Sequence, residues 1–142
     1  MRKMIDFRAL HNYFKVQPVD LVYLMGSQAS GTVKPYSDID IGVLFDPKFS
    51  SSERFNLKIA VIADLSKILG TDNIDLVDLG SANPHLAFEA IKHRKEIYSK
   101  DEKTRVHFET KVLSEYFDQQ FYLSRHTILG LKNLKEEYGI RA

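Results

Sequence analysis

The sequence predicts an α/β (α+β) domain, with helices flanking a small mixed β-sheet and a long helical segment at the C-terminus. Three observations predict this fold class. Short apolar runs rich in strand formers alternate with helical patterns over residues 1–98. Residues 99–142 keep helical spacing almost throughout. The 142-residue chain is long enough to bury a core without disulfides or structural metals.

The composition argues against nucleic-acid and membrane partners. The 20 Lys and Arg residues nearly balance the 19 Asp and Glu residues, and no basic run occurs, so we expect no direct nucleic-acid binding. No apolar stretch has the pattern of a membrane span or signal peptide, so we expect no membrane partner and a cytoplasmic location. The absence of cysteine excludes disulfides, thiolate metal ligands and cysteine nucleophiles.

The N-terminal quarter predicts one helix and one strand. Residues 4–16 place apolar side chains at helical spacing, which predicts a packing helix that ends before Pro18. We expect His11 on its surface, since no other residue accompanies it at metal-binding spacing. Residues 19–25 form an apolar run of strand formers that stops at Gly26, which predicts a buried strand.

A second strand, residues 38–45, carries a pair of carboxylates. Its side chains alternate, so Asp38 and Asp40 share one face while Ile39 and Ile41 point to the core. The two carboxylates are then roughly 7 Å apart at the backbone, close enough to converge on shared cations. Two ions held in this way can activate an attacking oxygen and stabilise a leaving phosphate in in-line displacement.

Gly26 and Ser27 precede these carboxylates and have the chemistry of a phosphate site. Gly26 permits close backbone approach, and Ser27 offers a hydroxyl and an amide at the expected start of a helix. A lone Asp-x-Asp is usually a turn or a cap. The full pattern Gly-Ser, ten residues, Asp-x-Asp should arise by chance in roughly one chain of this length in several hundred, so it predicts a triphosphate site.

The middle of the chain alternates helices and strands. Ser50 and Glu53 form a capping-box pattern that opens a helix with an apolar stripe, and Gly70 is its expected stop. The stripe comprises Phe55, Ile59, Ile62, Leu65, Ile68 and Leu69. Pro84 is expected at the first position of the next helix, and residues 96–98 are expected to form a brief edge strand.

The strand expected over residues 73–79 supplies a third carboxylate. Asp75, between Ile74 and Leu76, would be costly inside an apolar strand unless it met a partner such as a metal ion or a proton to accept. Asp78 falls on the opposite face near the strand end, so we interpret it as a loop or cap residue.

The C-terminal segment is longer than the rest of the domain is wide. A capping box at Ser99 and Glu102 is expected to open a helix of roughly 55 Å, against a radius of gyration of about 14–15 Å for a compact domain of this size. It must therefore bend, with Ser124 and Gly130 as candidate breaks, or overhang. Its two apolar stripes either both pack on the sheet or partly meet another protein. They comprise Val106, Leu113, Phe117, Phe121, Ile128 and Leu131 in the first, and Phe108, Val112, Tyr116, Leu123 and Leu134 in the second.

These motifs resemble a known signature. Gly26-Ser27-x10-Asp38-x-Asp40 is similar to that of the nucleotidyltransferase superfamily that includes DNA polymerase beta, and in particular to its minimal nucleotidyltransferase (MNT) branch. Within that branch the chain most resembles the MntA-type antitoxins paired with HEPN-domain toxins. The resemblance implies a nucleotidyltransferase fold. Its core would span residues 1–98, with residues 99–142 as a C-terminal helical extension, either part of the same domain or a partner-binding appendage.

The resemblance also implies a reaction: transfer of AMP from ATP to a tyrosine hydroxyl of a cognate HEPN toxin, which neutralises that toxin. The position of Asp75 resembles the third carboxylate of the family. Asp38, Asp40 and Asp75 would hold two Mg²⁺ ions, and Asp75 would also orient or deprotonate the acceptor. Gly26 and Ser27 would cradle the triphosphate. Ser37 is either a donor to a phosphate oxygen or a turn residue.

Two other functions fit the sequence. Many relatives carry arginines where this chain has Gln28 and Ser30, and Lys34 is the only cation left in that loop. This departure favours a stoichiometric binding antitoxin, in which the C-terminal helix covers the toxin, whereas the intact carboxylates favour catalysis. The third possibility is nucleotide transfer to a small hydroxylated compound. For the AMP-transferring antitoxin and for the binding antitoxin, the partner is the HEPN toxin, which we expect to bind through the C-terminal helix.

Overall fold

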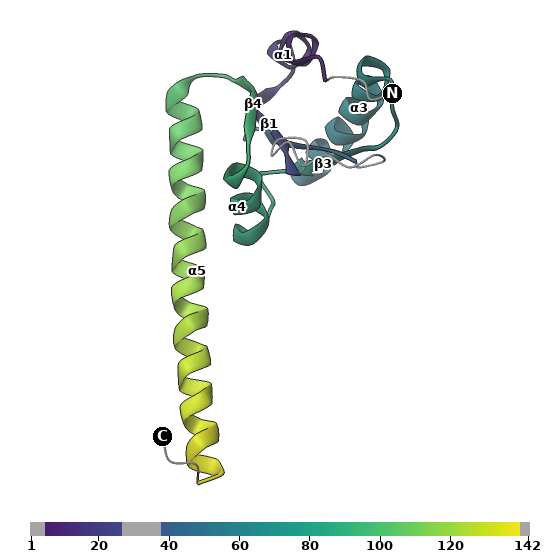
Figure 1. Ribbon diagram of the computed structural model, residues 1–142. Helices are drawn as coiled ribbons and strands as arrows, with labels where there is room; N and C mark the ends of the chain where they lie inside the picture. Colours follow the sequence, from purple (N-terminus) through teal and green to yellow (C-terminus); the bar gives the residue numbers. More distant parts are fainter. Residues whose placement is uncertain (1–4, 27–37, 140–142) are drawn as a thin grey trace.

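A four-stranded mixed β-sheet forms the centre of this computed structural model, which describes residues 5–26 and 38–139 (Figure 1). The strand order is β3-β2-β1-β4, with β1 antiparallel to both neighbours and β2 parallel to β3. The predicted mixed sheet is therefore confirmed. The strands are β1 (Val19–Met25), β2 (Ile39–Phe45), β3 (Ile74–Asp78) and β4 (Lys95–Ser99).

Four helices are described around this sheet, and local sequence fixes their ends. The Ser50–Glu53 capping box opens α3 as predicted, and Gly70 ends it in the left-handed region with a φ of 67°. Asn83 caps α4, with Pro84 at its first position. The helices are α1 (Phe7–Lys15), α3 (Ser51–Leu69), α4 (Pro84–Lys92) and α5 (Glu102–Glu137).

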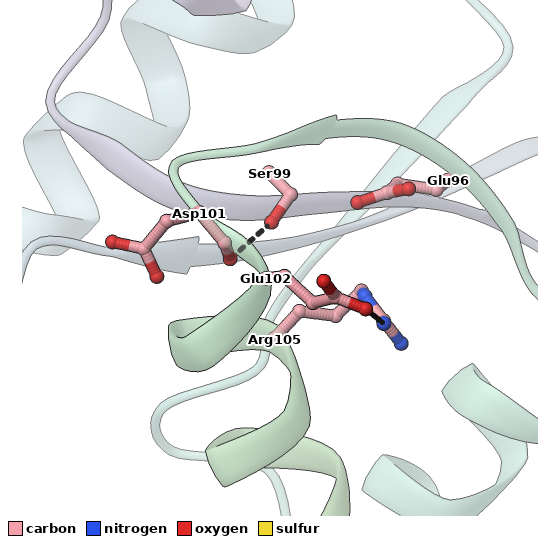
Figure 2. A pocket seen from close by; sticks show the side chains of 5 residues that line it. All are labelled: Glu96, Ser99, Asp101, Glu102 and Arg105. Carbon is pink, nitrogen blue, oxygen red and sulfur yellow. Dashed lines mark hydrogen bonds and ion pairs between the residues drawn. The ribbon is translucent and has the colours of Figure 1, made fainter.

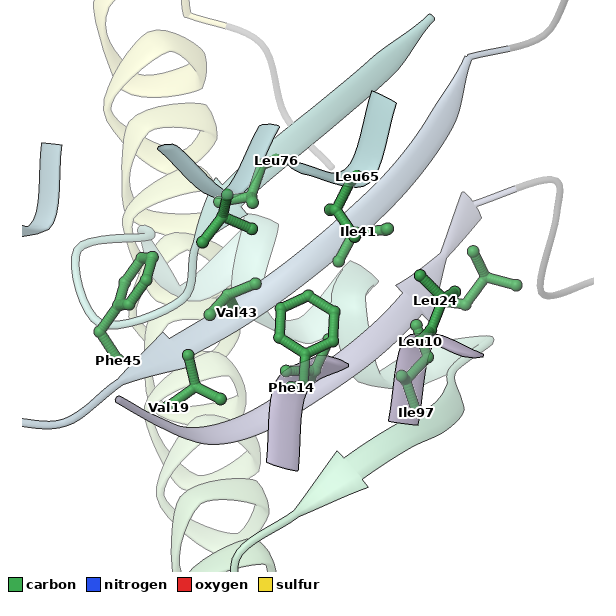
Figure 3. Packing of buried hydrophobic residues seen from close by; sticks show 12 residues of the cluster. Leu10, Phe14, Val19, Leu24, Ile41, Val43, Phe45, Leu65, Leu76 and Ile97 are labelled. Atoms are coloured by element: carbon green, nitrogen blue, oxygen red, sulfur yellow. The ribbon is translucent and has the colours of Figure 1, made fainter. Parts of the chain in front are cut away.

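Each face of the sheet has its own hydrophobic cluster. On one face, α1 and α3 pack against β1 and β2 through side chains such as Phe14, Ile41 and Leu65 (Figure 3). On the other face, α4 and the first part of α5 cover Leu21 and Tyr23 of β1. Burial of both faces explains why β1 is continuously buried from Leu21 to Met25 rather than alternating.

The predicted apolar stripe of α3 is only partly correct. Leu65 is fully buried and Ile62 packs against the core, but Phe55 and Ile59 are more than half exposed. The buried face instead includes Val61, which the stripe omitted. Because α3 covers the sheet near its edge strand β3, only a narrow strip of the helix meets the core, and its remaining apolar residues face outward.

The C-terminal helix overhangs the core without a break (Figure 1). Ser124 and Gly130 both lie inside the continuous helix α5, so the predicted breaks at these positions are wrong. The helix can remain straight because nothing forces it back onto the sheet: every residue from Phe117 to Gly139 is exposed. The interpretation in which both apolar stripes pack on the sheet is therefore also wrong.

The start of α5 also differs from the prediction. Ser99 does not cap the helix, because it is the last residue of β4 and pairs with Leu21. Asp101 is the N-cap instead, and its side chain accepts a hydrogen bond from the backbone N–H of Thr104. Among the described residues, no helix combines the length and apolar character needed to cross a membrane.

Candidate active site

The sheet brings two of the three predicted carboxylates side by side. Asp40 of β2 and Asp75 of β3 are directly paired in register, and parallel neighbours of this kind lie about 4.8 Å apart and point to the same face. Asp38 immediately precedes β2, two residues before Asp40, and is exposed. The three carboxylates therefore gather at one end of β2 and β3.

Electrostatic repulsion is built into this group. The pKa of Asp40 is raised above its ordinary value, first by burial and then by the neighbouring charges of Asp75 and Asp38. The carboxylate of Asp40 is half-buried. An ionised Asp40 therefore costs free energy in the protein alone, and a cation bound between the carboxylates would relieve that cost.

The expectation of a buried Asp75 is wrong, because its side chain is exposed. β3 is an edge strand, so one of its sides is open to solvent while Leu76 turns inward to the core. Solvation removes the argument that this carboxylate needs a partner in order to be tolerated. The same exposure leaves Asp75 accessible to a large molecule that approaches the sheet edge.

Gly26 lies directly against the Asp40 carboxylate. It follows β1 with a φ of 65°, a left-handed conformation that favours glycine. A Cβ atom placed on Gly26 would lie 2.7 Å from Oδ2 of Asp40, which is closer than such atoms can approach. The predicted close backbone approach at this position is thus directed at the carboxylate itself.

Gly26→Ala is expected to impair the site more than the fold. The left-handed conformation costs an alanine about 1–2 kcal/mol, whereas the new methyl group would push Asp40 out of place. We expect the activity of this site to fall by about 100-fold, the scale of effect of a misplacement of about 1 Å in an active site. Steady-state kinetics and thermal unfolding check this. Gly139→Ala is the control, because Gly139 follows α5 with the same φ of 65° and no atom lies near a Cβ there. Equal activity in both variants would contradict the assignment.

Ser27 and Ser37, the other predicted nucleotide-binding residues, lie outside the described residues, as do Gln28, Ser30 and Lys34. Their assignments stay predictions. In the described part of the site, the backbone at Gly26 and the carboxylates of Asp38, Asp40 and Asp75 stand at the same end of neighbouring strands. This is the end where residues 27–37 connect β1 to β2.

The chemistry of these carboxylates fits a hard divalent cation. Mg²⁺ prefers oxygen ligands and is commonly held by one or two carboxylates together with substrate phosphates. As they stand, no three Asp, Glu or His side chains within residues 5–26 and 38–139 are close enough to complete a metal site. Such a site would therefore use two of these carboxylates at a time or draw them together when the ion binds.

Sequence reasoning missed residues that position the site. Gly42 stands two residues after Asp40, and a Cβ there would lie 2.7 Å from Sδ of Met25. Its missing side chain thus lets Met25 and Leu79 pack across β2. A glycine inside an apolar strand was the available signal for this close approach. Asp78 accepts a hydrogen bond from the N–H of Gly80 at the strand end, as interpreted.

Two ion-pair assignments were also missed. Asp78 pairs with Arg54 of α3, with a 2.9 Å separation between Nε and Oδ2. Arg94 pairs with Glu109 of α5, with a 2.8 Å separation between Nε and Oε1. Both pairs join residues that are distant in the sequence, so periodicity and spacing carry no signal for them.

A hollow of about 240 Å³ lies at the junction of β4 and α5 (Figure 2). It is separate from the three carboxylates, because β4 lies on the other side of β1 from β2 and β3. Its polar groups are mostly used within the fold: Asp101 caps α5, and Arg105 pairs with Glu102 at 3.3 Å. Nothing in its chemistry resembles the predicted site. It is lined by Glu96, Ser99, Asp101, Glu102 and Arg105.

Comparison with known proteins agrees with this geometry. The family described as Polymerase beta, Nucleotidyltransferase matches residues 8–103. Protein adenylyltransferase MntA of Shewanella oneidensis is 31% identical over 114 residues, which cover 80% of this chain and 76% of that protein.

Two solved structures illustrate the similarity. A toxin–antitoxin crystal structure with AMP-PNP contains a chain of 26% identity with a TM-score of 0.66, covering 89% of this chain and 97% of that one. The complex of a tri-AMPylated Shewanella oneidensis HEPN toxin with its MNT antitoxin matches with a TM-score of 0.59 and 26% identity, covering 88% and 97%. The chain therefore belongs to the polymerase beta nucleotidyltransferase family and, within it, to the MntA-type branch.

Proposed function

We propose that this chain is an antitoxin that transfers AMP from ATP to a tyrosine hydroxyl of a cognate HEPN toxin and thereby neutralises the toxin. The observation that carries the proposal is the paired placement of Asp40 and Asp75, with the backbone of Gly26 held against Asp40. The relatives supply the reaction: one is an adenylyltransferase, and another is an antitoxin bound to an AMPylated HEPN toxin.

Each predicted site residue would have its own role in this reaction. Gly26 and Ser27 would cradle the triphosphate, with Ser37 as a further donor to a phosphate oxygen. Asp38, Asp40 and Asp75 would hold two Mg²⁺ ions, which supply charge neutralisation for the phosphates and activation of the attacking hydroxyl. The neighbouring charges of Asp75 and Asp38, which add to the effect of burial in raising the pKa of Asp40, also favour binding of a cation there.

The covalent step is a single displacement. The tyrosine oxygen forms a bond to the α-phosphorus of ATP, the bond to the bridging oxygen breaks, and pyrophosphate leaves. Asp75 would accept the phenolic proton, a role supported by its position beside Asp40 and by its exposure. Open exposure of Asp38 and Asp75 suits an acceptor as large as a folded protein better than an enclosed small molecule.

We further propose that residues 1–98 are the catalytic core and that residues 99–142 form an extension through which the toxin binds. The support is the exposure of α5 beyond Phe117, which includes large apolar side chains. The same observation favours the second candidate function, a binding antitoxin that inhibits by coverage alone. The two candidates differ in whether neutralisation needs the carboxylates.

Intact-mass measurement separates these candidates. The HEPN-domain protein encoded beside this chain is incubated with it, Mg²⁺ and each nucleoside triphosphate in turn. We expect the toxin to gain the mass of one or more AMP units with ATP and to gain no mass with the other triphosphates. With Asp38→Asn we expect no mass gain. A stable complex that neutralises the toxin without any mass gain would instead establish the binding antitoxin.

A further inference from the structure

Arg94 lies beside the end of β1, on the side away from the three carboxylates. It comes one residue before Lys95, the first residue of β4, which pairs with Leu24 of β1. Antiparallel register therefore brings Arg94 to the level of Met25. Met25 pairs with Asp40 on its other side. Arg94 and the carboxylates thus stand on opposite flanks of one strand end, about 10 Å apart at the backbone.

Arg94 and Asp40 also share one face of the sheet. Arg94 donates a 2.7 Å hydrogen bond from Nη1 to the backbone carbonyl of Ile91, and Ile91 packs in the same hydrophobic cluster as Met25. Asp40 comes two residues before Gly42, whose open side is filled by Met25, so Asp40 points to that face as well. A ligand on this face at the end of β1 can therefore contact both groups.

The guanidinium of Arg94 is held in place and still has unused donors. Its Nε lies 2.8 Å from Oε1 of Glu109, and its Nη2 donates to Oε2 at 3.3 Å. Together with the bond to Ile91, these contacts use three of the five N–H donors of an arginine. Within residues 5–26 and 38–139 the other two donors, one on each terminal nitrogen, make no hydrogen bond. The side chain is 38% exposed, so an incoming ligand can reach them.

A phosphate is the ligand that suits these donors. A guanidinium is planar and permanently charged, and its fork of N–H groups matches phosphate oxygens in geometry. Because Glu109 and Ile91 already fix the side chain of Arg94, little conformational entropy remains to be lost when a ligand binds. Gly26 directly follows Met25, so a triphosphate held against its backbone would lie between the carboxylates and Arg94.

We propose that Arg94 is a phosphate-binding residue that contacts the two terminal phosphates of the nucleotide, which leave as pyrophosphate. The α-phosphorus would lie beside Asp40, where the acceptor attacks, so the terminal phosphates are the part that can extend past Gly26 to Arg94. The identity of the ligand, a nucleoside triphosphate, rests on the proposed function. The position of Arg94 and its two unused donors rest on the fold alone.

Equilibrium binding of nucleotides to the full chain, with Mg²⁺ and without an acceptor, tests this role. Arg94→Gln is expected to weaken the Kd for ATP by about 10-fold or more, the scale of a lost hydrogen bond to a charged group. The Kd for AMP, which lacks the terminal phosphates, should stay unchanged. Arg94→Lys keeps a cation for Glu109 but has no planar fork, so it should keep the wild-type Tm and still weaken the Kd for ATP.

Two matched variants are the controls. Lys95→Gln removes a cation from the same strand end but on the other face of the sheet, where Nζ of Lys95 lies 5.9 Å from the centre of the Phe7 ring. Arg105→Gln removes the second guanidinium that pairs with Glu109, at 3.0 Å between Nη1 and Oε2. Neither control should change the Kd for ATP. An equal loss with Lys95→Gln would show that only overall charge matters, and an equal loss with Arg105→Gln would show that Arg94 acts only through Glu109.

Either of those losses would overturn the phosphate-binding role of Arg94. Wild-type affinity of Arg94→Gln for ATP, an equal loss for AMP and ATP, or no binding of ATP by the wild-type chain would overturn it too. In the transfer assay, Arg94→Gln should raise the KM for ATP and leave the KM for the acceptor unchanged. Failure of the proposed function gives a different pattern: ATP binding depends on Arg94 as expected, while the wild-type chain adds no AMP to its partner.

Discussion

Replacing Asp40 by asparagine is expected to abolish AMP transfer and, in the same protein, to increase thermal stability at neutral pH. The loss of activity follows from its position, because Asp40 stands between the backbone of Gly26 and the carboxylate of Asp75. A bound metal ion contributes several kcal/mol of charge stabilisation in the transition state. Under the proposed mechanism Asp40 is the central ligand of this ion, so its loss should reduce the rate by about 1,000-fold or more.

The gain in stability follows from the direction of the pKa shift. The pKa of Asp40 is raised by burial and by the charges of Asp75 and Asp38, so ionisation costs more in the folded chain than in the unfolded chain. The uncharged amide removes that cost at neutral pH. As pH falls through the folded pKa, the wild-type carboxyl takes up its proton and the difference shrinks. It should vanish below about pH 3.9, the ordinary value for aspartate.

Thermal unfolding at several pH values, with and without Mg²⁺, measures both parts of this prediction. Added Mg²⁺ should raise the Tm of the wild-type chain more than that of Asp40→Asn, since a ligand stabilises the state that binds it. Asp72→Asn is the control, because Asp72 is exposed and lies outside the carboxylate group. A lower Tm for Asp40→Asn at neutral pH would show that the carboxylates do not repel one another.

Local sequence was sufficient to predict most of the sheet and its carboxylates. The Asp38-x-Asp40 alternation correctly separates the outward carboxylates from the buried Ile41 of β2. Asp75 was identified next to an apolar strand, and the register pairs it with Asp40. The exposure of Asp75 could not be predicted from local sequence, because it depends on β3 being an edge strand. Strand order is a property of the whole chain rather than of residues 73–79.

The errors in the helices have the same origin. Periodicity identifies an apolar stripe but does not show what covers it. Phe55 of α3 was placed in a packing stripe, and Phe117 of α5 was left open between packing on the sheet and contact with another protein; both are exposed. Gly130 predicted a break in α5. A glycine in a helix costs only about 1 kcal/mol, however, and the neighbouring helical residues can offset that cost. The attachment of α5 depends on residues far apart in the chain.

That attachment centres on Glu109, the one charged residue found in the buried set across residues 5–26 and 38–139. Its Oε1 accepts a hydrogen bond of 2.8 Å from the hydroxyl of Tyr23 in β1 and lies 2.8 Å from Nε of Arg94. Its Oε2 lies 3.0 Å from Nη1 of Arg105, one turn earlier in α5. Three elements of structure thus meet at one carboxylate. Burial, followed by this hydrogen bond, raises the pKa of Tyr23, which keeps its hydroxyl a donor.

Glu109→Ala is expected to lower the free energy of unfolding by about 2–3 kcal/mol, because the buried hydroxyl of Tyr23 loses its acceptor while Arg94 and Arg105 keep contact with solvent. For a chain of this size that corresponds to a fall in Tm of about 5–10 °C. Glu115→Ala is the matched control on the same helix. Its carboxylate is exposed and lies as far as 4.0 Å from Nζ of Lys111. Its loss should therefore cost no more than about 1 kcal/mol.

The same substitution should affect function through α5 rather than through the carboxylates. If the Glu109 contacts set the angle at which α5 leaves the core, Glu109→Ala should raise the KM for the protein acceptor at temperatures where the chain is folded. Glu109→Gln keeps an acceptor for Tyr23 and should restore part of the lost stability. A fall in Tm with an unchanged KM would mean that Glu109 only stabilises the core, and that docking does not depend on the angle at which α5 leaves it.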